Sequence, residues 1–264
     1  MMKASRSSLT TAIAVLSLLA VPILLGLDAS AKDDKSPGSL TALEILKKSD
    51  DLHFGYQDSQ LKIKTIVKDK DGKKSELKYN VWEKGEKRLI VMDEPPDVAG
   101  MAVLSKDEDT IYVYEPEFNK VRRIASHAKK QTMFGMDYTS DETATKHLHK
   151  SYTPKIKSET SEKAVLTLEQ KSGKDKAWPK LEVTIEKNNH WAATKILFMD
   201  KNGKKKKPEV RPKIKQLGGR YLATVMTMTD HGKKHSTTLL VKSAKYDKGL
   251  SDKMFTKRYL IREE

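Results

Sequence analysis

Alternation of apolar and polar residues is the feature that most constrains this fold, and it runs through most of the chain after Gln60. In the stretch LKIKTIVKDKDGKKSELKYNVWEK, residues 61–84, apolar side chains alternate with lysines on both sides of Asp71-Gly72. A period of two gives a strand one buried and one wet face, and Asp-Gly signals a tight hairpin turn. The stretch therefore predicts an antiparallel hairpin that packs on a core through one face.

Strand signals recur along the rest of the sequence, separated by turn signals. We expect strands in EKRLIVMDE, MAVLS, TIYVYEP, KVRRIAS, SYTPKIKSET, KAVLTLEQK, KLEVTIEKN, WAATKILFMDKNG, GRYLATVMTMTD and HSTTLLVKSAKYD. This spacing favours a meandering antiparallel sheet of about a dozen strands, closed or half-closed as a barrel. We interpret residues 204–207 with Pro208 and Pro212 as a basic loop, and Gly218-Gly219 as a bulge or bend.

Helices are expected only near the two ends of the chain that follows the leader. Thr41 and Glu44 have capping-box spacing, which predicts a helix that ends near Asp51. Ser251 is a candidate N-cap for a short helical turn near the C-terminus. Residues 126–150 form the longest stretch without a period of two, so we expect irregular structure there.

The first 31 residues have the order of a secretory signal peptide. Basic residues precede an apolar run over residues 9–27, and Ala29-Ser30-Ala31 forms a small-x-small cleavage site. Because the apolar run is longer than usual, an uncleaved membrane anchor is the alternative. Cleavage after Ala31 would leave residues 32–264 as a single exported domain.

Export changes the meaning of the composition. The chain has no cysteine, which excludes disulfides, a thiol nucleophile and thiolate metal sites. Its net charge of +15 would suggest nucleic acid inside a cell, but an exported protein meets anionic lipid head groups and acidic proteins instead. A solvated surface that only keeps the protein soluble is the alternative reading of these charges.

Motifs for catalysis are missing from the sequence. It has no G-x-S-x-G elbow, no P-loop and no dinucleotide-binding glycine pattern. His147 and His149 would share one face of a strand and could bind a divalent metal, but no third ligand is fixed by the sequence. We therefore predict a protein that is not an enzyme and has no cofactor and no metal.

The apolar residues suggest a cavity. A single curved sheet of this length needs a cover on its concave face, and one helix with a short turn does not fill it. Methionine adapts to irregular spaces, and Met133 and Met136 flank Phe134-Gly135 within the irregular stretch. We expect a ligand cavity with this patch as its flexible cover. The candidate lining residues are Trp82, Leu89, Val91, Met101, Val103, Ile111, Val113, Met133, Phe134, Met136 and Tyr138.

Residues 81–142 resemble the outer-membrane lipoprotein-sorting family of LolA/LolB-like proteins. The matching features are Trp82 with Lys84-Gly85, the Tyr112-x-Tyr114-x-Pro116 run, Arg122-Arg123-Ile124 and the FGMDY motif at residues 134–138. The resemblance implies a half-open antiparallel barrel of about 11 strands around a helix-covered apolar cavity. It also implies a periplasmic location and makes Arg122 and Arg123 candidates for the family's lid arginine or for head-group binding.

Two functions from different classes remain. The first is a periplasmic carrier of lipid or lipoprotein acyl chains toward the outer membrane, with an inner-membrane transporter and an outer-membrane acceptor as partners and no nucleic acid. The second is a non-enzymatic scaffold or sensor module that partners an envelope transporter. An internal cavity would distinguish them, because a scaffold can fill its sheet with its own side chains.

Overall fold

The computed structural model describes residues 39–261. The signal peptide predicted over residues 1–31 lies outside the described residues. Residues from Leu40 onward form one compact unit. Among the described residues, no helix combines the length and the hydrophobicity needed to cross a bilayer.

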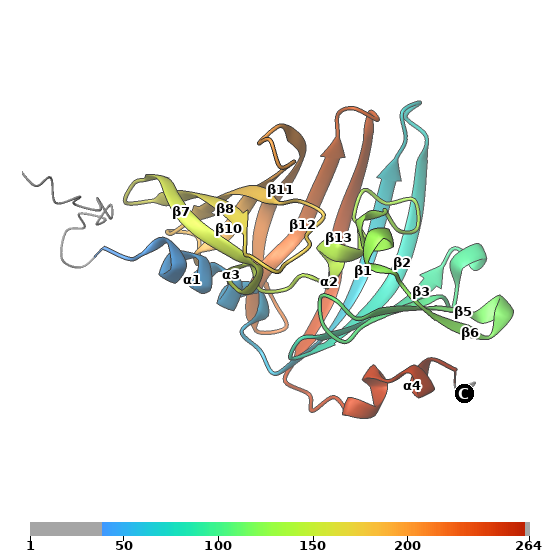
Figure 1. The fold of residues 1–264 in the computed structure, drawn as a ribbon. Coiled ribbons are helices and arrows are strands. Elements are labelled where there is room, and N and C mark those ends of the chain that lie inside the picture. Colours follow the sequence, from blue (N-terminus) through green and yellow to red (C-terminus); the bar gives the residue numbers. More distant parts are fainter. Residues whose placement is uncertain (1–38, 262–264) are drawn as a thin grey trace, which may run out of the picture. The chain divides into compact units, whose positions relative to one another are not determined.

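A single antiparallel sheet of 13 strands dominates the unit (Figure 1). The strand order is β6-β5-β4-β3-β2-β1-β13-β12-β11-β10-β9-β8-β7, so nearly every pair is a hairpin of consecutive strands. The strands are β1 Asp58–Lys68, β2 Lys74–Lys84, β3 Lys87–Glu94, β4 Ala102–Ser105, β5 Ile111–Glu115, β6 Lys120–Arg123, β7 Tyr152–Glu159, β8 Lys163–Gln170, β9 Lys180–Glu186, β10 Ala192–Met199, β11 Lys205–Leu217, β12 Arg220–Asp230 and β13 His235–Tyr246.

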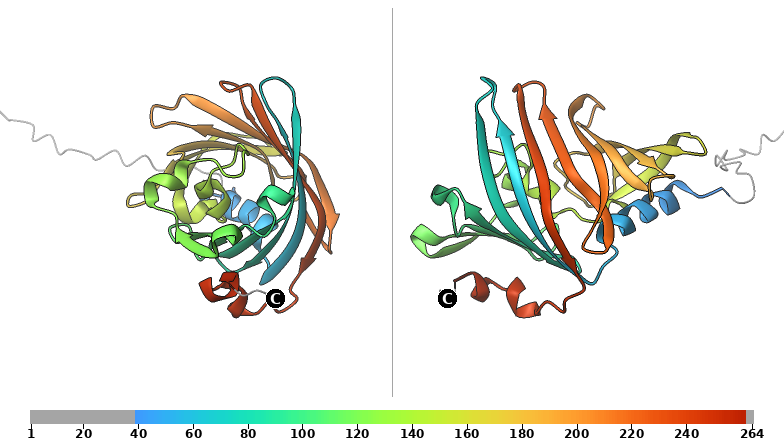
Figure 2. Two further views of the ribbon diagram at one scale, coloured as in Figure 1. Left: turned by 90° about the vertical axis from the view of Figure 1, so that its right-hand side faces the viewer. Right: turned by 180° about the vertical axis from the view of Figure 1, so that it is seen from behind.

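The sheet curls strongly but stays open, as Figure 2 shows. Its two edges, β6 and β7, are not paired with each other. The prediction of a mainly β, half-open antiparallel barrel with few helices is therefore confirmed. The sheet has 13 strands where the resemblance suggested about 11.

The two edge strands are consecutive in sequence, which forces the chain between them across the concave face. We call residues 124–151 the crossing segment. It contains η3 Ser126–Lys130, α2 Ser140–Ala144 and α3 Leu148–Ser151, so the stretch expected to be irregular holds three short helices that the sequence did not predict. Its middle is fixed to the sheet, because the backbone N–H of Asp137 donates to Thr237 Oγ1 on β13 at 2.8 Å.

Helix α1, Ala42–Phe54, covers part of the same face. Thr41 and Glu44 form the predicted capping box, and Ile45 and Leu46 are fully buried. The helix runs one turn beyond the predicted end at Asp51. The ring of Phe54 lies 5.4 Å from the ring of His147 in the crossing segment, and this contact anchors the extra turn.

The prediction of a basic loop at residues 204–207 is wrong. Residues from Lys205 on belong to β11, which pairs with β10 and β12. Pro212 sits where the register with β12 shifts, at a bulge that does not need its missing N–H. Of the two structures predicted for Gly218-Gly219, the bend is the one found: both residues have positive φ, 63° and 90°, and form the two-residue turn between β11 and β12.

The C-terminal segment covers the other face of the sheet. It contains η4 Asp252–Phe255, capped by Ser251 as predicted, and α4 Lys257–Ile261. Leu250, Phe255 and Leu260 pack there against strands β3 and β4. Two further turns, η1 Pro96–Val98 and η2 Pro116–Phe118, join neighbouring strands. Strands β2 to β5 are thus covered on both faces, by different parts of the chain.

Candidate ligand-binding cavity

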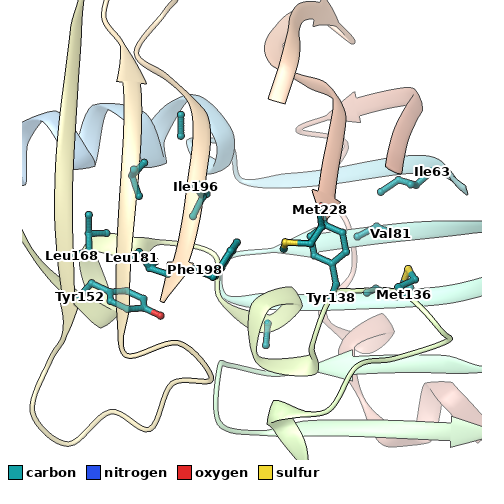
Figure 3. Close-up of a cluster of buried hydrophobic side chains, with 14 of the residues drawn as sticks. Ile63, Val81, Met136, Tyr138, Tyr152, Leu168, Leu181, Ile196, Phe198 and Met228 are labelled. Carbon is teal, nitrogen blue, oxygen red and sulfur yellow. The ribbon is translucent and has the colours of Figure 1, made fainter. Parts of the chain in front are cut away.

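A cavity of about 210 Å³ lies between the concave face of the sheet, the end of α1 and the crossing segment. A second space of about 100 Å³ continues under β9 and β10, and a third of about 30 Å³ lies beneath Met133 and Phe134. Tyr138 lines all three spaces. Figure 3 shows its ring between Met228 on one side and Val81 and Met136 on the other.

The wall is mainly apolar because strands β2 and β13 point alternate, apolar side chains into the cavity. Tyr79 and Val81 on β2, with Leu239 and Val241 on β13, face the cavity in this way. The apolar lining of the 210 Å³ space comes from Phe54, Leu61, Ile63, Tyr79, Val81, Ile90, Leu222, Ala223, Met226, Leu239 and Val241. This volume is more than ten times the roughly 10–15 Å³ that one water needs.

One polar group in the wall is centred on Glu83. Its carboxylate is 2.6 Å from the Arg88 guanidinium and accepts hydrogen bonds from Tyr56 and from Ser59. Burial alone would raise the pKa of Glu83, but the charges of Arg88 and Lys146 and the hydroxyl hydrogen bonds lower it to about 2. Glu83 is therefore ionised, and its charge is balanced inside the protein.

A second polar group lies at the end of α1. Arg211 Nε is 2.6 Å from Glu209 Oε1, and Arg211 Nη1 is 3.4 Å from His53 Nε2. Burial and the Arg211 charge lower the pKa of His53 to about 3, so its ring is neutral at neutral pH. The cavity therefore has charged pairs at its margin and apolar side chains between them.

The Tyr138 hydroxyl is buried in the cavity wall and faces the Glu209 carboxylate, with which it forms no well-aligned hydrogen bond. Burial and the nearby Glu209 charge raise its pKa well above the usual value for tyrosine. The hydroxyl therefore stays protonated and is available as a donor to a polar atom of a ligand.

The turn at Met133-Phe134-Gly135-Met136 has a backbone that favours glycine. Phe134 and Gly135 have φ of 51° and 69°, and the N–H of Met136 donates to the carbonyl of Met133 at 2.8 Å. Met133, Phe134 and Met136 line the smallest space. The bend is possible because glycine adopts the positive φ of position 135 without strain. The predicted apolar cover thus lies over the cavity.

Buried ion pairs hold the crossing segment on the sheet. Lys207 of β11 is buried; its ammonium lies 3.0 Å from Glu142 of α2 and donates to the carbonyl of Asp137 at 2.5 Å. Trp178 Nε1 donates to the same Glu142 carboxylate at 2.8 Å. Burial raises the pKa of Glu142, and the Lys207 charge opposes that shift.

The predicted lining residues fall into three groups. Tyr138 lines the cavity, and Met133, Phe134 and Met136 line its smallest space. Met101, Val103, Ile111 and Val113 belong to the same core cluster without lining a space. Trp82, Leu89 and Val91 belong to the cluster on the opposite face of the sheet, under the C-terminal segment. We leave these last three out of the cavity.

The predicted arginines lie elsewhere as well. Arg122 and Arg123 are exposed on β6, at the edge of the sheet, where Arg122 pairs with Glu115. The arginines that line the cavity are Arg88 and Arg211, which sequence reasoning missed. The alternation of β3 could have identified Arg88, because Arg88 lies two residues before Ile90 and therefore points to the same face of the sheet.

The two histidines of the H-x-H motif lie in and beside α3, not on a strand, and Asp50 of α1 joins them. One ligand atom from each of Asp50, His147 and His149 falls within 4.8 Å of the others. The Asp50 carboxylate already accepts hydrogen bonds from the N–H groups of Leu148 and His149, and it lies 2.6 Å from His149 Nδ1. In this arrangement the group attaches α1 to the crossing segment.

Comparison with known proteins supports the fold. Residues 84–262 match the model of a family described as "Uncharacterized protein". No protein with a curated description matches the sequence.

Three solved structures share most of the architecture. An outer membrane lipoprotein-sorting protein domain from Vibrio parahaemolyticus is 24% identical with a TM-score of 0.74, over 84% of this chain and 98% of that one. A DUF1329 family protein from Desulfovibrio piger is 20% identical with a TM-score of 0.76, over 83% and 97%. A LolA superfamily protein from Nitrosomonas europaea is 20% identical with a TM-score of 0.72, over 84% and 100%. At these identities the likeness shows a LolA-like fold.

Proposed function

This chain belongs to the family whose model matches residues 84–262, and from that premise and its LolA-like fold we propose that it is an acyl-chain carrier. The cargo would be the acyl chains of lipids or lipoproteins, held in the cavity during transport toward the outer membrane. The protein would act by binding alone, without catalysis.

The observation that carries this proposal is the cavity itself. Its three spaces are neighbours that share lining residues, and their walls are apolar over most of their surface. Each methylene that leaves water for such a wall gains about 0.8 kcal/mol. Methionines at the cover suit a cargo of variable shape, because their unbranched side chains adapt to it.

The polar margin suits the other end of such a ligand. The Arg88 and Arg211 guanidiniums and the Tyr138 hydroxyl offer hydrogen-bond donors beside the apolar wall. The signal peptide predicted over residues 1–31 supports a periplasmic location. An inner-membrane transporter and an outer-membrane acceptor are the partners that such transport requires.

Native mass spectrometry of the protein purified from its own envelope tests the proposal. We expect a co-purifying lipid, and the lipid-free protein should take up a fluorescent fatty acid. A protein with neither property would be the scaffold module instead, and the proposal would fail.

A matched pair of variants tests the cover. Met133→Asp with Phe134→Asp should weaken fatty-acid binding by about tenfold, because charges would enter an apolar space, while the fold remains. Phe118→Asp is the control, since its side chain is 56% exposed at a hairpin tip away from the cavity. Unfolding of the double variant would instead identify the patch as ordinary core.

A further inference from the structure

Three neighbouring hairpin tips form one edge of the sheet, which we call the basic rim. Its parts are residues 68–74 between β1 and β2, residues 200–206 between β10 and β11, and residues 230–234 between β12 and β13. The register places them at the same end, because Lys68 pairs with both Lys74 and Ser236. The tips of these strands lie along the top of the views in Figure 1 and Figure 2.

The basic rim concentrates charge. It holds ten lysines and four aspartates, a net charge of +6 out of +15 for the whole chain. Among the described residues, no carboxylate pairs within 4 Å with seven of these lysines. The seven are Lys68, Lys73, Lys74, Lys201, Lys204, Lys205 and Lys234.

Three of the four aspartates of the rim stabilise the turns through hydrogen bonds to the backbone. Asp69 Oδ1 accepts the N–H groups of Asp71 and Lys73 at 3.0 and 2.9 Å, which closes the β1–β2 turn. Asp200 accepts two N–H groups in the same way, and Asp230 accepts one from Lys233. These carboxylates form turns, while the exposed lysines between them are not required by the turns.

An apolar turn lies beside the basic rim. Asp137, which follows Met136, contacts Thr237 at 2.8 Å and lies 2.8 Å from His235, the first residue after the β12–β13 tip. Asp137 thus joins the Met133–Met136 turn to His235, the residue that directly follows Lys233 and Lys234 in the sequence. Unpaired lysines beside an adaptable apolar turn are the combination that binds the interface of an anionic membrane.

We propose that the basic rim docks this protein on an anionic membrane surface, with phospholipid head groups as its ligands. The lysines meet the head groups, and the Met133–Met136 turn faces the boundary of the acyl region. This proposal rests on the proposed function for its purpose, the transfer of acyl chains, but binding to a membrane surface does not require the cavity to be filled.

Two charge-matched variants test the proposal with the full exported chain. The rim variant changes to glutamine six exposed lysines of the three tips, Lys73, Lys74, Lys201, Lys204, Lys205 and Lys234. The control changes six exposed lysines along the strands, Lys62, Lys195, Lys213, Lys215, Lys242 and Lys245. Both lose the same charge, and none of the twelve side chains forms an ion pair within residues 39–261.

Sedimentation with phosphatidylglycerol–phosphatidylcholine vesicles is the measurement. We expect the rim variant to bind about tenfold or more weakly than the natural protein, and the control within about twofold. Binding of the natural protein should fall with salt and be absent for pure phosphatidylcholine vesicles.

Two results would overturn the proposal. One is equal vesicle binding by the rim variant and the control. The other is no preference of the natural protein for anionic vesicles, which would point to an acidic protein partner. Ala223→Phe, which fills the cavity, should keep vesicle binding, so a failure of the carrier function and a failure of docking are distinguishable.

Discussion

The two faces of strands β2 to β5 have similar apolar residues but opposite packing. On the outer face, Leu89 and Leu104 are completely buried under the C-terminal segment. On the inner face, Val81 and Ile90 are also buried, yet they border a cavity of about 210 Å³. A short segment that follows the sheet fills one face, whereas a crossing segment fixed at a few buried ion pairs leaves space on the other.

The comparison teaches that the cover decides which face can bind a ligand. Both faces carry buried apolar residues, so hydrophobicity alone does not show which face holds the cavity. The C-terminal cover inserts Phe255, a large side chain that is 2% exposed, directly into the outer cluster. The inner cover spans the width of the sheet instead and contacts it at Thr237 and Lys207.

The largest expected effect is on the filled face. Phe255→Ala should lower the free energy of unfolding by about 3–5 kcal/mol, because it leaves a void in close-packed surroundings. Urea unfolding measures this loss. Fatty-acid binding by the folded variant should stay within about twofold of the natural protein, and a large loss of binding would show that the two faces are coupled.

Two alanine-to-phenylalanine variants separate the faces more sharply. Ala102→Phe adds volume to the filled outer face and should cost about 1–3 kcal/mol of stability. Ala223→Phe adds it to the cavity wall and should cost less, while it blocks fatty-acid uptake. Thermal unfolding and binding titrations of both test the comparison. Equal destabilisation by the two substitutions would mean that the cavity is filled in solution.

A smaller effect comes from the polar margin of the inner face. The pKa of His53 is about 3, below its ordinary value of 6.5, so between these values the unfolded chain binds a proton that the folded chain does not. The natural protein should therefore lose about 1–2 kcal/mol of stability as the pH falls from 6.5 to 5. His53→Gln removes this loss. Unfolding curves above pH 4.5 avoid the titration of Glu83, and identical pH profiles would contradict the assignment.

Much of the sheet could be predicted, because alternation and turn residues are local signals. Asp71-Gly72, for example, falls in the expected turn. Strand β11 was missed because five lysines and two prolines hide its period of two. Its Lys207 is buried only because Glu142 of the crossing segment pairs with it, a contact between residues 65 positions apart.

The candidate site was predicted less well. Alternation shows that Trp82 and Val81 face opposite sides but not which side holds the cavity. That choice depends on where the C-terminal segment packs, which the local sequence does not encode. The same holds for Asp50, which meets His149 only through the packing of α1 on α3. The Met133–Met136 turn was found because its composition departs from its surroundings.

The strand order also bears on how the chain reaches this structure. Residues 58–123 and 152–246 each form a series of hairpins between consecutive strands, and only the pairing of β1 with β13 joins them. That pairing brings Ser59 beside Tyr246. Local hairpins close quickly, whereas a contact this distant carries a larger loop-closure cost. We therefore expect two half-sheets to form first and their junction to limit the folding rate.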